Sequence, residues 1–191
     1  MSETTKTFLS EQSVMEDSFR LGVQICNSGF RPTFIVGLWR GGSTVGIYVQ
    51  ECLQTLGVET DHIAIRTSYE GQGDYNDMIN NPQQEIRVHG TQYLLETLNR
   101  EDSLLIVDDV FSTGLNVQAV VDRLRKRLKR NMPEDVRVAA LWYKPDERRV
   151  ELEPDYHQAT TSDWLVLPYE LTGLSEKELR QFKPAAARHL L

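Results

Sequence analysis

Short apolar runs alternate along the chain with longer stretches in which polar and apolar residues mix. Residues 33–38, 62–65, 104–107 and 136–143 are the runs richest in apolar residues. Continuous apolar runs of this length are typical of strands buried on both faces of a parallel sheet. The pattern therefore predicts four core strands.

Between these runs, apolar residues recur at spacings of three and four, the period of an amphipathic helix. The first helix is expected to begin after Ser10, a candidate N-cap, and to stop at residues 27–29. A second helix is expected to follow residues 39–43 and to close near Gly57. A third has its apolar stripe at Val117, Val120, Val121, Leu124 and Leu128.

A capping box at Ser175 and Glu178 predicts a further helix near the C-terminus. Because strands and helices alternate, the order predicts an α/β fold with a parallel sheet flanked by helices. Ligands of such folds bind at the carboxyl ends of the strands. The 191 residues are enough for one well-buried domain and few for two, so we expect a single domain over residues 1–191 with a core at about 10–145.

Charge and composition narrow the class of partner. The net charge of -7 argues against a general nucleic-acid binder, so we interpret the basic residues between 123 and 130 as a solvated helix end. Cys26 and Cys52 fit helical apolar patterns and are interpreted as core thiols. No apolar run is long enough to span a bilayer, and residues 1–12 lack an apolar signal core, so we expect a cytoplasmic protein with small-molecule partners and no membrane association.

Candidate chemistry follows the apolar run at residues 104–107. Asp108 and Asp109 stand where that strand is expected to leave the sheet. The next residues form a tight turn into a helix, and such a turn collects backbone N–H groups that hold a phosphate. The residues of this turn are Ser112, Thr113, Gly114, Leu115 and Asn116. Two acids beside a phosphate site suggest a sugar phosphate as ligand. The carboxylates can accept hydrogen bonds from the sugar hydroxyls or hold magnesium-bound water.

The continuous stretch LLIVDDVFSTGLN at residues 104–116 resembles the signature of the type I phosphoribosyltransferases. The resemblance covers roughly residues 33–170 and implies a fold of that type, phosphoribosyl pyrophosphate as substrate, and Mg²⁺ as cofactor. It also implies that Asp108 and Asp109 hold the ribose hydroxyls and that residues 112–116 bind the 5′-phosphate. Enzymes of this kind usually pair, so a homodimer or homotetramer is expected.

A second loop, WRGGS, joins the first core strand to the second helix. It lacks the Lys-Ser/Thr step of an ATP-binding P-loop. The resemblance implies that Arg40, Gly41 and Gly42 contact pyrophosphate, largely through backbone amides. The alternative is a strand-to-helix turn that merely needs glycine.

Residues 66–90 carry little apolar periodicity and many turn formers, which is typical of a functional or mobile loop. We expect a lid here. Ser68 and Tyr69 resemble the Ser-Tyr step of the catalytic loop in purine phosphoribosyltransferases, and Arg87 is a second candidate for pyrophosphate binding. Exposed loop residues with no special role are the alternative.

The segment 146–174 is expected to form a small hood over the base. It resembles the base-binding hood of bacterial xanthine-guanine and hypoxanthine phosphoribosyltransferases. The resemblance implies that Lys144 contacts the 6-oxo group, Trp164 stacks on the ring and Leu165 offers backbone contacts. It also implies that Asp109 and Glu170 hold magnesium, Glu170 through water, since Mg²⁺ usually keeps several waters. A core position is the alternative for Trp164.

One residue departs from the family pattern. Purine-salvage enzymes usually carry an acid at the position of Ser112, and a neutral hydroxyl cannot act as a base near neutral pH. The prediction is an Mg²⁺-dependent purine salvage phosphoribosyltransferase that accepts hypoxanthine, guanine or xanthine. Two alternatives stay open: a catalytically silent regulator that binds phosphoribosyl pyrophosphate, and a phosphoribosyltransferase for another nitrogenous base.

Overall fold

A six-stranded sheet forms the centre of the molecule in the computed structural model, which describes residues 6–69 and 86–191. The strand order is β4-β3-β2-β5-β6-β7, and every neighbouring pair is parallel except β3 and β4. The strands are β2 (Phe34–Trp39), β3 (Asp61–Tyr69), β4 (Ile86–His89), β5 (Ser103–Phe111), β6 (Asp135–Tyr143) and β7 (Tyr156–Thr160). The predicted α/β fold with a mostly parallel sheet is confirmed.

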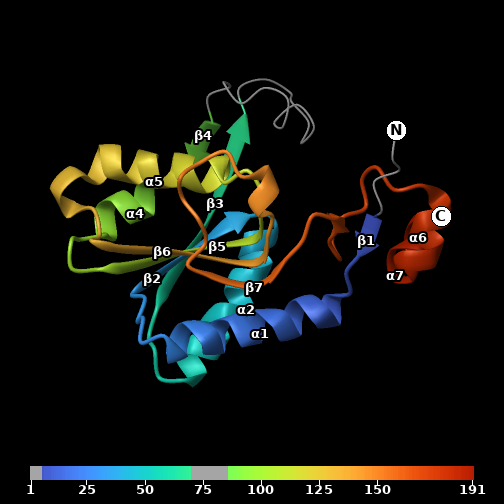
Figure 1. Ribbon diagram of the computed structural model, residues 1–191, viewed down its shortest axis with the longest axis horizontal. Coiled ribbons are helices and arrows are strands. Elements are labelled where there is room, and N and C mark those ends of the chain that lie inside the picture. The colour runs from blue at the N-terminus through green and yellow to red at the C-terminus, as the bar shows by residue number, and fades with distance from the viewer. Residues whose placement is uncertain (1–5, 70–85) are drawn as a thin grey trace.

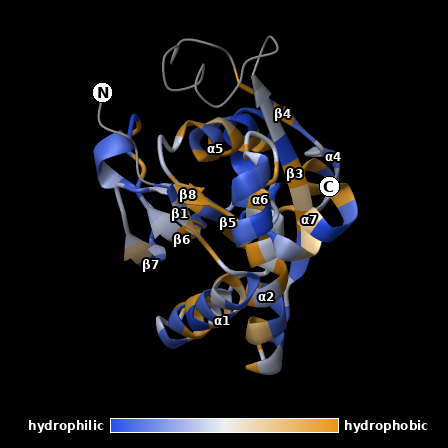
Figure 2. Cartoon of the chain, turned by 90° about the vertical axis from the view of Figure 1, so that its right-hand side faces the viewer, coloured by the Kyte–Doolittle hydropathy of each residue, from blue (hydrophilic) through white to orange (hydrophobic). Residues whose placement is uncertain are grey.

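Helices cover both faces of this sheet (Figure 1). On one face lie α1 (Glu11–Asn27) and α2 (Gly41–Thr55), and on the other α4 (Gln92–Thr97) and α5 (Leu115–Leu128). Figure 2 shows that α1 and α5 each carry both hydrophobic and hydrophilic residues, as amphipathic helices do. Among the described helices, none is long and apolar enough to cross a bilayer.

The central strand β5 contributes to two hydrophobic cores because successive side chains point to opposite faces. Leu104 and Ile106 pack in the core beneath α4 and α5, whereas Leu105 and Val107 pack in the core beneath α1 and α2. All four are fully buried. The apolar run at residues 104–107 is therefore explained by burial on both sides.

Two predicted helix starts are confirmed by their hydrogen bonds. The Ser10 side chain accepts from the backbone N–H of Ser13 at 3.0 Å, which caps α1. Ser175 and Glu178 form the predicted capping box at the start of α6 (Glu176–Phe182). These local contacts satisfy N–H groups that have no partner within the helix.

The strands are longer than the apolar pattern indicates. β5 continues through Asp108 and Asp109 to Phe111, because β6 runs alongside it as far as the Phe111–Tyr143 pair. The lid expected over residues 66–90 begins and ends in strand, since residues 66–69 pair with 86–89. The rest of that expected lid, residues 70–85, lies outside the described residues.

The segment expected to form the hood, residues 146–174, contributes strands to two sheets. β7 lies within the segment 146–174 but pairs with β6 as the edge of the main sheet. The N-terminal strand β1 (Lys6–Phe8) instead pairs in parallel with β8 (Trp164–Val166) in a separate two-stranded sheet. Sequence patterns do not reveal such a pairing, because its strands lie at opposite ends of the chain.

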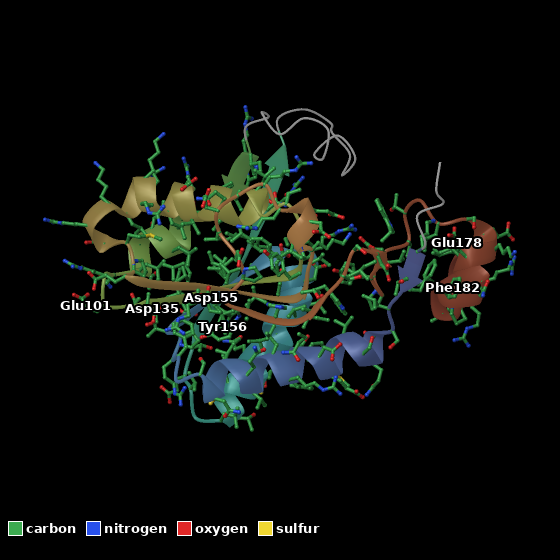
Figure 3. All side chains as sticks on the ribbon, viewed as in Figure 1. Glu101, Asp135, Asp155, Tyr156, Glu178 and Phe182 are labelled. Carbon is green, nitrogen blue, oxygen red and sulfur yellow. The ribbon has the colours of Figure 1, made fainter. Side chains whose placement is uncertain are left out.

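Together β1, β8, α6 and α7 (Pro184–Leu190) form what we call the terminal unit (Figure 1). The rings of Phe8 and Phe182 stack with centroids 3.9 Å apart, and Lys6 pairs with Glu178 at 2.7 Å. Figure 3 shows Glu178 and Phe182 beside β1. The buried Lys183 Nζ donates to the carbonyl oxygens of Leu167 and Pro168, at 2.5 and 3.1 Å. The C-terminal helices therefore hold the segment that follows β8.

Candidate active site

A cleft of about 650 Å³ lies at the carboxyl ends of β2, β5 and β6. Its far wall consists of residues between 164 and 174, which belong to β8 and the segment after it. Twelve of the predicted site residues line it: Arg40, Gly41, Asp108, Asp109, Ser112, Thr113, Gly114, Asn116, Lys144, Trp164, Leu165 and Glu170. Residues from five separate stretches of sequence thus meet at one edge of the sheet.

The acid pair, Asp108 and Asp109, lies on the part of β5 that extends beyond its pairing with β2. That pairing ends at Val107, whereas Asp108 still pairs with Ala140 of β6. Asp108 Oδ1 accepts from the N–H of Asp109 at 3.0 Å. Burial, and then the neighbouring Asp109 charge, raise the pKa of Asp108 well above its usual range.

Tyr169 contacts the acid pair from across the cleft. Its hydroxyl donates a hydrogen bond to Asp109 Oδ2, while Asp109 Oδ1 accepts from the N–H of Val110 at 2.9 Å. Burial and the Asp109 charge raise the pKa of Tyr169, so the phenol remains a donor. The sequence analysis missed this residue, and its only signal was its place beside Glu170. The contact joins the wall of the cleft to the acid pair.

Neighbouring atoms lie so close to the first residues of α2 that only glycine fits there. A Cβ on Gly41 would lie 1.8 Å from both Asp109 Oδ2 and the Tyr169 hydroxyl oxygen. A Cβ on Gly42 would lie 2.3 Å from the carbonyl oxygen of Val107. Gly42 does not line the cleft, so its observed place is in the packing of α2 against β5. Both glycines bring the helix start against the acid pair.

The turn after β5 leads into the N-terminus of α5. Gly114 is the N-cap of α5 with φ +74°, a left-handed conformation that favours glycine. Asn116 lies in the first turn of the helix, which Leu115 begins. Leu115 does not line the cleft, whereas Thr113 and Asn116 do. The N-terminus of α5 therefore faces the cleft, beside the acid pair.

Lys144 and Ser112 share a carboxylate that the sequence analysis missed. Lys144 follows β6, is 6% exposed, and places Nζ 3.0 Å from Glu147 Oε1. Ser112 is also 6% exposed and donates its hydroxyl hydrogen to Glu147 Oε2. Glu147 ends the short 3₁₀ helix η2 (Pro145–Glu147), and no motif marked it. It is an ordinary acid in a charged stretch, and only the fold brings it to Ser112.

The predicted lid residues lie on the β3–β4 pair. Ser68 is 2.9 Å from His89 Nε2 and stands opposite Arg87 in register. Among the described residues of this pair, Thr67 lines the cleft, and Ser68 and Arg87 do not. The Tyr69 backbone is the last described position of β3, and its side chain lies outside the described residues. Roles for these three residues stay predictions.

Comparison with known proteins identifies the family. The family model described as phosphoribosyl transferase domain matches residues 5–172, which is most of the chain. The chain belongs to the phosphoribosyltransferase family. This phosphoribosyltransferase is 27% identical over 175 residues to hypoxanthine-guanine phosphoribosyltransferase of Streptococcus pneumoniae. The matched region covers 91% of this chain and 86% of that relative.

Solved structures share the fold of this phosphoribosyltransferase. A purine phosphoribosyltransferase from Pyrococcus horikoshii has a TM-score of 0.65 and 21% identity, covering 89% of this chain and 97% of that chain. Xanthine-guanine-hypoxanthine phosphoribosyltransferase of Helicobacter pylori has a TM-score of 0.67 and 16% identity. The match covers 94% of this chain and 99% of that chain. The likeness extends over most of the length of each protein.

The oxygen ligands of the cleft suit Mg²⁺ bound in part through water. Within residues 6–69 and 86–191, no group of three or more His, Cys, Asp or Glu side chains forms a preformed metal site. Mg²⁺ is commonly held by one or two carboxylates together with substrate phosphates and water. Asp109 and Glu170 both line the cleft, although Glu170 Oε2 already accepts from the N–H of Leu167 at 2.9 Å. Both Asp109 oxygens also accept hydrogen bonds, from Tyr169 and from the N–H of Val110, so contact through water suits both carboxylates.

Proposed function

We propose that this phosphoribosyltransferase is a purine salvage enzyme. It transfers the phosphoribosyl group of phosphoribosyl pyrophosphate to a 6-oxopurine and releases pyrophosphate. The observation that carries the proposal is the meeting of the acid pair, the turn at residues 112–116, Lys144 and Trp164 in one cleft. The named activity of the Streptococcus pneumoniae relative supports the choice of a purine.

The acid pair is suited to the ribose. Its carboxylates accept hydrogen bonds from the sugar hydroxyls and stabilise positive charge that develops at the anomeric carbon as the pyrophosphate bond loosens. The N–H groups at the start of α5 hold the 5′-phosphate. Binding at both ends fixes the anomeric carbon, and positioning of this kind supplies a large part of the rate.

Pyrophosphate is assigned to the start of α2. Arg40 supplies positive charge, and the absence of a side chain on Gly41 lets the diphosphate approach the backbone. Asp109, with Glu170 acting through water, would hold Mg²⁺, which would supply positive charge to neutralise the leaving diphosphate. Ser68, Tyr69 and Arg87 are assigned to the same group when the lid closes and excludes water.

The base is assigned to the other end of the cleft. Trp164 offers an aromatic face for the purine ring, and Leu165 offers backbone groups to its edge. Lys144 donates to the 6-oxo oxygen, and its ammonium is held in place by Glu147 at 3.0 Å. A positioned cation selects a 6-oxo group over the 6-amino group of adenine, because an amino group is a donor and leaves the lysine unpaired.

The test is pyrophosphate release from phosphoribosyl pyrophosphate and Mg²⁺, with hypoxanthine, guanine, xanthine, adenine, uracil and orotate supplied separately. We expect turnover with 6-oxopurines and loss of turnover when Mg²⁺ is chelated. Binding of the sugar diphosphate without turnover on any base would refute the enzyme and favour a sensor. Turnover with uracil or orotate alone would refute the purine assignment. Mg²⁺ dependence, self-association and a cytoplasmic location stay predictions of this proposal.

A further inference from the structure

Joining a neutral purine to ribose requires that a ring proton leave. The ring nitrogen that forms the new bond gains a substituent, so a proton carried by the base must pass to an acceptor if the product is to be neutral. A side chain that accepts it must be within hydrogen-bonding reach, directly or through one intermediary. Ser112 lines the same cleft as the acid pair and Lys144, and a serine hydroxyl alone is too weak a base.

The structure places a carboxylate directly behind that hydroxyl. Ser112 donates to Glu147 Oε2, while Lys144 Nζ donates to the other oxygen of the same carboxylate at 3.0 Å. Ser112 and Lys144 line the cleft and are each 6% exposed, whereas Glu147 is not among the lining residues. Glu147 thus contacts two side chains that line the cleft, and its own side chain is 34% exposed.

A hydroxyl in this position can pass a proton on. It has one donor hydrogen and two oxygen lone pairs, so an oxygen that donates to a carboxylate can accept from a ring N–H at the same time. The direction of the Ser112 bond is the direction that a relay needs, since the donor hydrogen already points to Glu147.

We propose that Glu147 is the final acceptor of the base proton, reached through Ser112. The ring nitrogen at position 9 forms its bond to the anomeric carbon as the bond to pyrophosphate oxygen breaks, and pyrophosphate leaves with the electron pair. The proton on the ring nitrogen at position 7 passes to Ser112 Oγ, and the Ser112 proton passes to Glu147 Oε2. Ser112 ends unchanged, Glu147 ends protonated, and the nucleotide base ends neutral. This inference rests on the proposed function.

The charged neighbours of Glu147 are consistent with this assignment. Lys144 from the end of β6 is its ion-pair partner, and Arg148 is directed away, to Glu153 at 2.9 Å. The N–H of Arg149, two residues after η2, donates to the carbonyl oxygen of Thr113 at 3.0 Å, which ties this segment to the turn that carries Ser112. The acid pair lies on β5, the strand that leads into that turn. Lys144 and Glu147 thus form one unit, in which the lysine reads the base and the glutamate receives its proton.

The first test is Glu147→Gln, measured with guanine as acceptor. Glutamine has the same shape and can still accept from Lys144 and donate to Ser112, but it cannot take a proton. We expect kcat to fall about 10²-fold, in the range of general-base contributions, with the KM for guanine unchanged. Adding Ser112→Asp to Glu147→Gln should restore kcat at least tenfold by placing a carboxylate in the cleft. Glu153→Gln, which removes a neighbouring carboxylate outside the relay, is the matched control and should keep wild-type kinetics.

The second test separates proton transfer from mere positioning. The base 8-azaguanine has a more acidic ring N–H than guanine, so it depends less on a proton acceptor. The relay predicts a smaller loss of kcat for Glu147→Gln with 8-azaguanine than with guanine. An equal loss with both bases, or a raised KM with unchanged kcat, would refute the relay and leave Glu147 as a support for Lys144. Wild-type kcat in Glu147→Gln would refute the relay while the proposed function stands. Failure of the wild-type protein on every purine would instead refute both.

Discussion

A methyl group at position 41 would enter space that two functional side chains already fill. The Cβ of Gly41→Ala would lie 1.8 Å from Asp109 Oδ2 and from the Tyr169 hydroxyl, and ordinary contact begins near 3.4 Å. The two oxygens cannot easily move aside. Asp109 lies within β5, its Oδ1 accepts from the N–H of Val110, and its Oδ2 accepts from the Tyr169 hydroxyl. The substitution must therefore displace the acid pair or move α2 away from it.

The expected magnitude follows from that displacement. Moving a reacting group by about 1 Å costs on the order of 10²-fold in rate. We expect kcat/KM for pyrophosphate release to fall by at least about 10²-fold. Overpacking costs roughly 1–3 kcal/mol, which is less than the stability of a typical domain. The chain should therefore still fold, as urea denaturation followed by circular dichroism will measure.

Gly46→Ala is the matched control on the same helix. A Cβ there would meet Gly37 Cα at 3.8 Å, which is ordinary contact. We expect unchanged kcat/KM and equal or greater stability for this variant. Wild-type kcat/KM in Gly41→Ala would contradict the reasoning, because it would mean that the geometry around Asp109 does not matter to the reaction.

Three further predictions follow from individual contacts. Asp108→Asn removes a buried carboxyl whose pKa is raised in the folded state, so the wild-type protein loses stability as pH rises from the unfolded pKa of about 4 towards the folded pKa. The free energy of unfolding of the variant relative to wild type should grow over that range, and a pH-independent difference would contradict this. Trp164→Leu should raise the KM for the base about 2–10-fold with little change in kcat, because roughly 0.5–1.5 kcal/mol of stacking is lost. An unchanged KM would place the base elsewhere. Lys183→Met leaves the carbonyl oxygens of Leu167 and Pro168 without this donor and should cost about 1–3 kcal/mol in urea unfolding, whereas the exposed Lys177→Met on α6 should cost nothing measurable.

Local chemistry explains which parts of the fold could be predicted. The core strands and the caps at Ser10 and Ser175 depend on residues close together in sequence, and the structure contains them. The β1–β8 pair could not be predicted, because it joins residues 6–8 to residues 164–166 and neither strand has a distinctive pattern. Similarly, β5 extends through two acids that end its apolar run, since pairing with β6 outweighs the low strand propensity of aspartate.

The candidate site divides in the same way. Asp108, Asp109 and the turn at residues 112–116 are contiguous, so one motif predicts them all, and they line the cleft together except for Leu115. Tyr169 and Glu147 act through contacts with residues far away in sequence, at Asp109 and Ser112. A common tyrosine or glutamate carries no sign of such a contact. The departure at Ser112 was visible in the sequence, but the carboxylate that lies behind it became visible only in the fold.

The central claim is transfer of a phosphoribosyl group to a 6-oxopurine at the acid pair. The most direct measurement is to incubate the protein with phosphoribosyl pyrophosphate, Mg²⁺ and hypoxanthine or guanine, and to identify the nucleotide formed by mass spectrometry. A double variant, Asp108→Asn with Asp109→Asn, serves as the comparison after its folding has been verified by circular dichroism. We predict the nucleoside monophosphate and an equal amount of pyrophosphate from the wild-type protein, and neither product from the folded double variant. Full activity in that variant, or no nucleotide from the wild-type protein, would contradict the account.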